Sequence, residues 1–420
     1  MTLPQPDAPA PRRTGGEFAA YLTMLTAYFV AFGMQMILFP YLVANVLEVS
    51  ASAVGVAQVA LQIPMLVLLL WGGLIAERME PRGYLIALHL VGIVPPAILA
   101  GLIALGWLSY PLMLVYGLAM GSFAAMALPA RDAALNGVVM RDAAKGRHIT
   151  LQKAVTLATA AQLGGQLAGM GLAGSASVIG VLPLIAVQCV AFGIASIAAL
   201  GLARRTKTVA RVARGLRGAL SDIADGVRFA LGHRVMLPMI LIAGYVGVFV
   251  IGSFSVLFPL IVRDSYGMGA EGLSLAFVAF WSASFCSSVA LSRLKPLERP
   301  GRALLASQFA GAIALASFAI EKPFAGFLAV IVAWGLAAGV ALSMSRTITQ
   351  QEAEPAYLAR VLSVYSLGFM GGAPIGAGAM GLLSEAFGPR MAALFPAAGL
   401  AIAILWMAAR TPIWTLTRKV

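Results

Sequence analysis

Charged side chains are scarce in this chain of 420 residues. Asp, Glu, Lys and Arg together make up 11% of the sequence, and hydrophobic residues make up 60%. Soluble domains carry about 25% charged residues. Such a sequence cannot cover a water-exposed surface with polar groups. The composition therefore excludes a water-soluble fold and predicts a membrane protein.

Acidic side chains are also missing from the apolar runs. The 16 Asp and Glu residues fall in predicted tails, loops or helix ends, so we expect no carboxylate at the membrane midplane, where proton relays commonly use one. HExxH, GxSxG and paired midplane carboxylates are absent, which argues against an intramembrane enzyme. Residues 376–381 fit GxGxxG but lie within a predicted spanning helix, without the preceding strand that a dinucleotide site requires. We expect no cofactor.

Cysteine is rare as well. Cys189 and Cys286 both fall inside predicted spans, and they show no CxxC or other metal-ligand spacing. Buried free cysteine commonly packs as a small hydrophobic residue. The sequence therefore predicts no disulfide and no metal site.

Long apolar runs dominate the remainder of the chain. Ten runs are free of Asp, Glu, Lys and Arg, and the two longest, 83–130 and 154–203, can each hold two helices, because a spanning helix needs about 20 apolar residues. Turn-forming residues near 107–111 and 174–177 divide these two runs. The sequence thus predicts an all-α integral membrane protein with twelve spanning helices. Their predicted ranges are 18–43, 53–76, 84–106, 110–130, 149–173, 178–203, 236–262, 272–292, 303–320, 324–344, 360–384 and 391–409.

Lys and Arg are distributed unevenly over the predicted loops. If the N-terminus lies inside, only Arg263, Lys322 and Arg390 of the 29 basic residues fall on the outer side. Cytoplasmic loops retain positive charge, so both termini are predicted to be cytoplasmic. The asymmetry also accounts for the net charge of +13 without a nucleic-acid partner. The first apolar run fits a retained helix better than a signal peptide.

Residues 204–235 form the longest polar segment and divide the chain into halves. Leu216, Leu220, Ile223, Val227 and Leu231 recur at helical spacing, which predicts an amphipathic helix on the inner membrane surface; docking of a regulatory partner is the alternative. The predicted domains are a disordered tail at 1–17, a six-helix bundle at 18–203, this basic linker at 204–235, a second six-helix bundle at 236–409 and a cytoplasmic tail at 410–420.

The loop GLIAERMEPR, at residues 73–82, carries the most specific functional signal. It resembles the signature loop between the second and third helices of the major facilitator superfamily, which reads Gly, three residues, Asp-Arg and further basic residues. The resemblance implies two pseudo-symmetric six-helix bundles and transport by alternating access. Glu77 stands where the family commonly has Asp, and Glu80-Pro81 interrupts the usual Gly and basic run.

The same resemblance implies a conformational switch. In the family, the loop acid lies near the start of helix eleven, where the helix dipole favours an anion, and loop Arg residues pair with an acid at the foot of helix four. These contacts latch the cytoplasmic side when the cavity opens outward. A merely solvated loop is the alternative. The residues that match the switch are Gly73, Glu77, Arg78, Arg82, Arg131, Asp132 and Arg360.

Further stretches resemble the enterobactin-exporter and macrolide-efflux branch of this family, whose members export siderophores, drugs or related metabolites. Proton antiport is a family expectation. His89 is titratable and lies inside the third helix, but that helix is peripheral in the fold, which favours structural hydrogen bonding. The matching stretches are Phe39–Val43, Gln62–Pro64, Pro129–Arg131 and, most specific, Arg360–Gly376.

Polar residues inside the spans indicate where a substrate would bind. They are costly unless they face a cavity or a partner helix, and for each one helix packing is the alternative. With no midplane charge, a bulky neutral or amphiphilic substrate, siderophore-like or drug-like, is favoured over a small ion. The predicted contacts are Tyr28, Gln35, Gln58, Gln62, Gln162, Gln166, Tyr245, Trp281, Ser284, Tyr365 and Met370.

Pairs of glycines four residues apart predict close helix approach, at Gly117/Gly121, Gly165/Gly169, Gly335/Gly339 and Gly372/Gly376. The predicted partners are a small-molecule substrate, membrane lipids and, as a candidate coupling ion, the proton. We expect a monomer in a bacterial inner membrane and no nucleic acid. A lipid or lysophospholipid flippase, and a membrane sensor of the same fold that does not transport, are the alternative functions.

Overall fold

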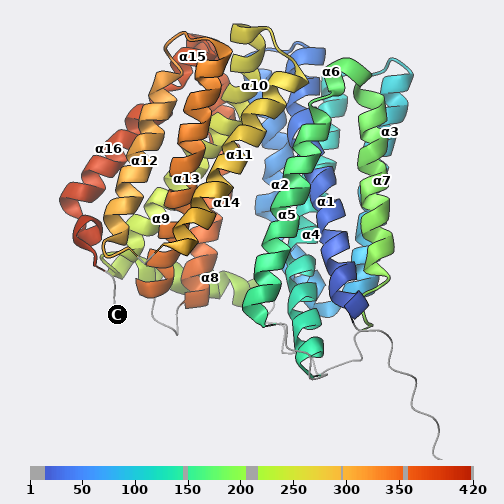
Figure 1. The fold of residues 1–420 in the computed structure, drawn as a ribbon, viewed down its shortest axis with the longest axis horizontal. Coiled ribbons are helices and arrows are strands. Elements are labelled where there is room, and N and C mark those ends of the chain that lie inside the picture. The colour runs from blue at the N-terminus through green and yellow to red at the C-terminus, as the bar shows by residue number, and fades with distance from the viewer. Residues whose placement is uncertain (1–14, 145–149, 205–215, 295–296, 353–357, 418–420) are drawn as a thin grey trace, which may run out of the picture.

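The computed structural model describes residues 15–144, 150–204, 216–294, 297–352 and 358–417. Within these residues the chain folds into an all-helical bundle of twelve spans (Figure 1). The first six spans are α1 (Gly15–Tyr41) with its π-helical end η1 (Leu42–Val46), α2 (Ala51–Arg78), α3 (Pro81–Ala104), α4 (Tyr110–Ala144), α5 (Leu151–Ala173) and α7 (Val181–Ala199).

The second six spans begin with a composite helix. It consists of α9 (Met236–Tyr245), the π-helical segment η2 (Val246–Ile251) and α10 (Gly252–Tyr266). The others are α11 (Ala270–Arg293), α12 (Pro300–Ser317), α13 (Phe324–Glu352), α14 (Leu358–Phe387) and α16 (Leu394–Arg410). Shorter elements are α6 (Ala176–Ile179), α15 (Pro389–Ala392) and the 3₁₀ helix η3 (Pro412–Thr415), and α8 (Leu216–Gly232) lies in the linker.

Ten of the spans are long and apolar enough to cross a membrane by composition alone. The other two are α5, whose first turn contains Gln152 and Lys153, and α12, whose first turn contains Arg302. Both pack lengthwise inside the bundle, α5 along α1 and α12 along α13 and α16. The predicted all-α membrane fold is therefore confirmed, and ten of the twelve predicted spans meet this criterion.

Helix pairing repeats between the two halves. In the first half α1 packs on α5, α2 on α4 and α3 on α7; in the second half the composite span packs on α14, α11 on α13 and α12 on α16. These are the same three pairs, the first span with the fifth, the second with the fourth and the third with the sixth. Between the halves, α2 packs on α14 and α5 on α11, again a second span with a fifth. The halves are thus related by pseudo-twofold symmetry.

Glycines make these pairs close. A Cβ atom added to one glycine of each predicted pair would overlap the backbone of the partner helix, so only hydrogen fits between the chains. The predicted close approach is confirmed in all four pairs, where the overlaps join Gly121 to Leu61, Gly169 to Val30, Gly339 to Ser284 and Gly376 to Val248.

Some helices are longer than predicted. The ends of the charge-free runs predicted that helix four ends at residue 130 and helix ten at residue 344. In the structure, α4 continues to Ala144 and α13 to Glu352. Charge limits the length of the apolar core but not that of the helix, because Ala, Leu, Met and Arg are all good helix formers outside it. At the N-terminus, α1 already begins at Gly15, inside the predicted tail. The preceding residues, 1–14, lie outside the described part of the chain.

The two ends of the bundle differ. We call the end at which α8 lies the linker end, and the end with α6 and α15 the opposite end (Figure 1). Five of the hydrogen bonds between described residues of the two halves lie at the opposite end. Arg263 Nη1 donates to Ala44 O at 2.7 Å and to Val49 O at 3.2 Å. The other three join Asn45 Nδ2 to Met268 O, Ser52 N to Glu385 Oε2 and Ser274 Oγ to Met170 O.

Candidate functional site

A cavity of about 450 Å³ lies between the halves. Helices of both halves contribute to its wall, among them α1, α2 and α4 from the first and α10, α11, α13 and α14 from the second. None of the described residues that line it is Asp, Glu, Lys, Arg or His. We call it the central cavity. The described side chains on its surface can therefore contact a molecule through shape, apolar contact and neutral hydrogen bonds.

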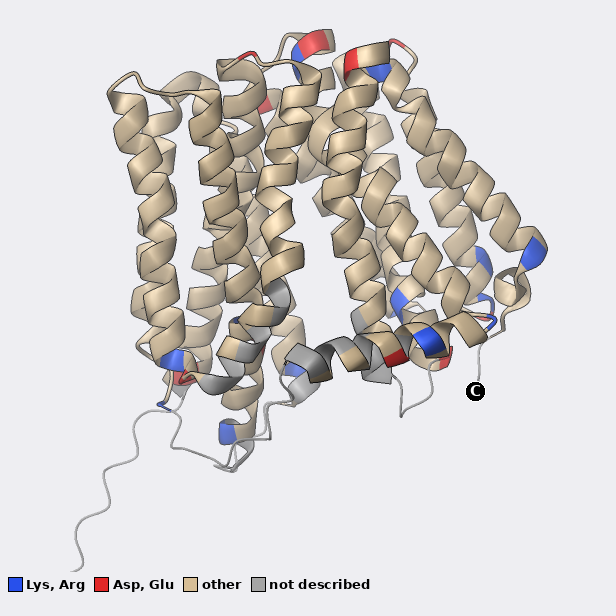
Figure 2. Ribbon diagram, turned by 180° about the vertical axis from the view of Figure 1, so that it is seen from behind, with Lys and Arg blue, Asp and Glu red and all other residues tan. Residues whose placement is uncertain are grey.

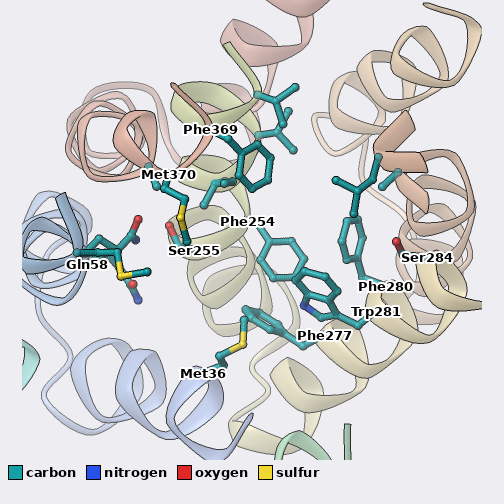
Figure 3. Close-up of a pocket in the computed structure, with 18 of the residues that line it drawn as sticks. Met36, Gln58, Phe254, Ser255, Phe277, Phe280, Trp281, Ser284, Phe369 and Met370 are labelled. Atoms are coloured by element: carbon teal, nitrogen blue, oxygen red, sulfur yellow. The ribbon is translucent and has the colours of Figure 1, made fainter. Parts of the chain in front are cut away.

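Aromatic rings from the second half form one wall. Phe254 of α10 has its ring centroid 4.4 Å from that of Phe277 and 4.8 Å from that of Phe280. Trp334 of α13 lies 5.2 Å from Phe280, and all four line the cavity. Figure 3 shows this wall together with Trp281, which lies across the cavity from Gln58. The wall presents a large, rigid apolar surface to any bound molecule.

Amide side chains and methionines of the first half face this wall. Gln58 and Gln62 of α2 line the cavity with Met36 and Met65, and Met370 of α14 is nearby (Figure 3). Methionine is flexible and accommodates varied shapes. The first half therefore supplies hydrogen-bonding capacity and an adaptable surface.

Gln35 is held in place by a buried network. Its Oε1 accepts hydrogen bonds from the Tyr116 hydroxyl at 2.5 Å and from Gln188 Nε2 at 3.0 Å. Gln188 Nε2 also lies 3.2 Å from Ala31 O. Neither Tyr116 nor Gln188 was predicted, because a single sequence does not show which helices bring polar side chains together.

Three buried polar atoms on the cavity wall have no hydrogen-bond partner among the described residues. They are Gln35 Nε2, Gln62 Oε1 and Trp281 Nε1. Buried polar groups are usually satisfied, and an unsatisfied one costs about 1–3 kcal/mol. The cavity therefore offers both donors and an acceptor to a molecule that enters it.

Most of the predicted contact residues reach the cavity. Eight of them line it, namely Tyr28, Gln35, Gln58, Gln62, Trp281, Ser284, Tyr365 and Met370. The structure does not bring Gln162, Gln166 or Tyr245 into it. Gln166 is buried where α5 crosses α1, with Nε2 3.4 Å from Met36 Sδ. The Tyr245 hydroxyl instead donates to Pro396 O on α16 at 3.2 Å.

Trp281 was predicted from the sequence, but most of the aromatic rings that line the second half of the cavity were not. Phe254, Phe277, Phe280, Trp334 and Phe369 are apolar residues in apolar helices. Lipid-facing and cavity-facing aromatics look alike in such a sequence, so no pattern distinguishes them.

The predicted switch residues are only partly described. Gly73, Glu77 and Arg78 lie in α2 and Arg360 lies in α14, but their side chains are outside the described part of the structure. Glu80 caps α3, with its carboxylate accepting from Arg82 N at 3.2 Å and from Gly83 N at 2.7 Å. Asp132 is exposed. The latch itself remains a prediction.

Arg131 lies deeper than a loop latch requires. Its side chain is 4% exposed, and its guanidinium carbon stands 3.8 Å from the centroid of the Tyr28 ring and 4.8 Å from that of Phe29. Nε is 3.3 Å from Ala127 O, whereas Nη1 has no hydrogen-bond partner within the described part of the chain. A buried guanidinium is thus held by two aromatic faces and one carbonyl.

His89 packs on the same Tyr28 ring, with 5.9 Å between ring centroids. Its Nδ1 lies 2.7 Å from Leu85 O, and because a carbonyl only accepts, Nδ1 must be the donor. This contact agrees with the structural hydrogen bonding expected for His89. Its Nε2 has no hydrogen-bond partner among the described residues.

Comparison with known proteins was made for sequence and for fold. The family model of the Major Facilitator Superfamily matches residues 22–367. No curated protein sequence matches the chain. Among solved structures, the fold is similar to that of the nucleoside transporter NupG, with a TM-score of 0.73 and 13% identity over 93% of this chain and 98% of that one.

Two further solved structures are similar over almost their full length. One is a bacterial homolog of the human lysosomal transporter Spinster in an inward-facing, unoccupied conformation, with a TM-score of 0.65, 13% identity and 97% of both chains covered. The other is the xylose transporter XylE from E. coli in an inward-open conformation, with a TM-score of 0.66, 12% identity and 96% of both chains covered. At these identities the likeness shows a shared fold.

Proposed function

This chain belongs to the Major Facilitator Superfamily, and we propose that it exports a bulky neutral or amphiphilic small molecule across a membrane by alternating access. The observation that carries the proposal is the central cavity. It lies between the two halves, and no charged residue is found among the described residues of its wall. The resemblance of residues 360–376 to siderophore and drug exporters supports export of such molecules.

The charge distribution supports an orientation. Lys and Arg residues gather at the linker end, whereas the opposite end carries several acids (Figure 2). Positive charge is retained on the cytoplasmic side, so we place the linker end in the cytoplasm of a bacterial inner membrane. The hydrogen bonds between the halves then close the outer side, and this conformation takes up cargo from the cytoplasm. We propose the monomer as the transporting unit and the proton as the coupling ion.

Flux in proteoliposomes tests the function directly. The purified full chain would be offered a radiolabelled siderophore, a radiolabelled macrolide and a fluorescent lysophospholipid, each with and without an imposed pH gradient. Gradient-dependent accumulation of the siderophore or the macrolide is the expected result. Movement of the lysophospholipid alone indicates a flippase. Binding without movement of any probe indicates a sensor, and either outcome contradicts the proposal.

Replacing Glu77 by Gln should reduce flux at least tenfold while leaving the amount of folded protein unchanged. Glu77 lies at the end of α2, which packs along α14, and the latch needs its negative charge at the start of that helix. The matched control is Glu80→Gln, three residues away, which removes a charge that caps α3 in its own half. Wild-type flux in Glu77→Gln, or an equal loss in both variants, contradicts the latch.

Replacing Gln58 by Ala should raise the KM for transport about fivefold, the cost of one lost hydrogen bond. Gln58 is buried on the cavity wall. Gln162→Ala makes the same substitution on α5 outside the cavity and should leave the KM within about twofold, below the cost of one hydrogen bond. An unchanged KM in Gln58→Ala, or an equal rise in Gln162→Ala, would remove Gln58 from the binding site.

A further inference from the structure

A positive charge, that of Arg131, is buried next to the central cavity. Arg131 is 4% exposed, and its Nη1 has no hydrogen-bond partner among the described residues. No ion pair joins it to any described acid. Asp132, the next residue, is the nearest acid; it is accessible to solvent, and water weakens its attraction to Arg131 without removing it. Buried charges are normally paired, so the lone guanidinium keeps a strong local field.

One ring separates this charge from the cavity. Tyr28 lines the cavity, and its ring lies 3.8 Å from the Arg131 guanidinium carbon. Phe123 and Phe192 also line the cavity and lie within 6.1 Å of the Tyr28 ring, centroid to centroid. The rings of Tyr28, Phe123 and Phe192 form an apolar layer on the side of the cavity next to Arg131, and we call this layer the floor. Apolar material screens charge far less than water does, so the positive potential extends into the cavity.

Nothing on the described cavity wall opposes that potential. The wall contains amides, hydroxyls, aromatic rings and methionines, and none of its described residues is acidic. His89 is the other titratable side chain packed on the Tyr28 ring, and its Nδ1 donates to Leu85 O. The floor and the wall together offer a cation no carboxylate to pair with.

We infer that the central cavity selects its substrate by charge, with Arg131 as a specificity-determining residue beneath the Tyr28 ring. It takes bulky aromatic molecules that are neutral or anionic and excludes lipophilic cations. The inference rests on the proposed function and narrows it. Among siderophore-like and drug-like molecules, it favours uncharged or acidic aromatic compounds over amine-bearing ones. Arg131 acts at a distance, through the potential inside the cavity.

Three probes of similar size and shape test this selection. Tetraphenylphosphonium is a cation, tetraphenylborate is an anion, and triphenylphosphine oxide is neutral with a hydrogen-bond acceptor. Equilibrium binding of each would be measured on the purified full chain in lipid nanodiscs. Affinities are compared between variants in identical nanodiscs, so that partitioning of the probes into lipid cancels. The variants are Arg131→Gln, Arg131→Lys and Arg141→Gln.

Arg131→Gln should change the ratio of anion to cation affinity by about tenfold, in favour of the cation, as expected for one charge acting across a partly screened distance. The neutral probe should change by less than about threefold, because it carries no net charge. Arg131→Lys should keep the wild-type ratio. Arg141→Gln removes a charge from the same helix, where Arg141 pairs with Glu17 at 2.6 Å, and should also keep the ratio.

An unchanged ratio in Arg131→Gln, or an equal change in Arg141→Gln, overturns the role of Arg131. The wild type gives a test that needs no variant: binding of tetraphenylphosphonium as tight as that of triphenylphosphine oxide overturns charge selection. Absence of binding by all three probes contradicts the cavity as a binding site and the selection built on it. Equal binding of the two ions contradicts the selection alone and leaves the proposed function standing.

Discussion

Replacing Gly376 by Ala is expected to destabilise the folded protein by more than about 3 kcal/mol, the upper range for overpacking a core. A Cβ atom at this position would overlap the carbonyl oxygen of Val248, and the overlapped atom is backbone. The contact joins α14 to η2, two elements that also line the central cavity. Neither α14 nor η2 can shift without moving part of the wall of the central cavity. Thermal unfolding in detergent, followed by the loss of monodisperse protein, measures the effect.

Gly378→Ala is the matched control on the same helix. A Cβ at Gly378 would stand 3.5 Å from Val59 Cγ2, which is ordinary van der Waals contact. Both substitutions remove one glycine from the interior of α14, and the gain in helix propensity of up to about 1 kcal/mol is the same for both. The control should therefore be at least as stable as the wild type. Equal stability of Gly376→Ala and Gly378→Ala would show that backbone contact at Gly376 is not required.

Replacing Arg263 by Gln should shift the protein towards a conformation that is open at the opposite end, by more than tenfold in population. Arg263 donates to two backbone carbonyls of the other half and is oriented by Asp264, with Nε 2.5 Å from Oδ1. Hydrogen bonds from a charged donor contribute about 1.5–3 kcal/mol each. Loss of these two hydrogen bonds destabilises only the conformation that is closed at the opposite end.

Distances between spin labels at residues 178 and 387 would report the shift. Val178 and Phe387 are exposed, lie at the opposite end and belong to different halves; Cys189 and Cys286 would first be replaced. Arg390→Gln is the control, because Arg390 bonds to Ser265 Oγ and Ile320 O within its own half. We expect a longer distance population in Arg263→Gln only. Identical distance distributions in both variants would contradict closure by Arg263.

The spans could be predicted because the membrane imposes a simple rule. Apolar length and the position of Lys and Arg are local properties of the sequence, and so are glycine pairs such as Gly372 and Gly376. Charge ends an apolar run but not a helix, and this is why α4 and α13 extend beyond their predicted ends. The π-helical segments η1 and η2 depend on tertiary packing and leave no mark in the sequence.

The same distinction between local properties and tertiary contacts applies to the predicted binding residues. Polar residues in spans stand out, so Gln58, Gln62 and Trp281 could be proposed from the sequence alone. The rule cannot say which polar residue faces a cavity and which faces a neighbouring helix. Tyr245, which bonds to α16, therefore looked the same as Tyr365, which reaches the cavity. Arg131 appeared to be part of a loop motif until the structure showed it packed on Tyr28.

The π-helical segment η2 sets the rotation of the seventh span. An α-helix turns by about 100° for each residue, and a π-helical turn accommodates one extra residue. Upstream of η2, the Tyr245 hydroxyl bonds to α16; downstream, the Arg263 guanidinium bonds to η1. Without the wide turn, Arg263 would face about 100° away from Ala44. Deleting one residue of η2 would therefore rotate one of these two contacts out of place, and a change in the middle of the span would break a contact at the opposite end of the bundle.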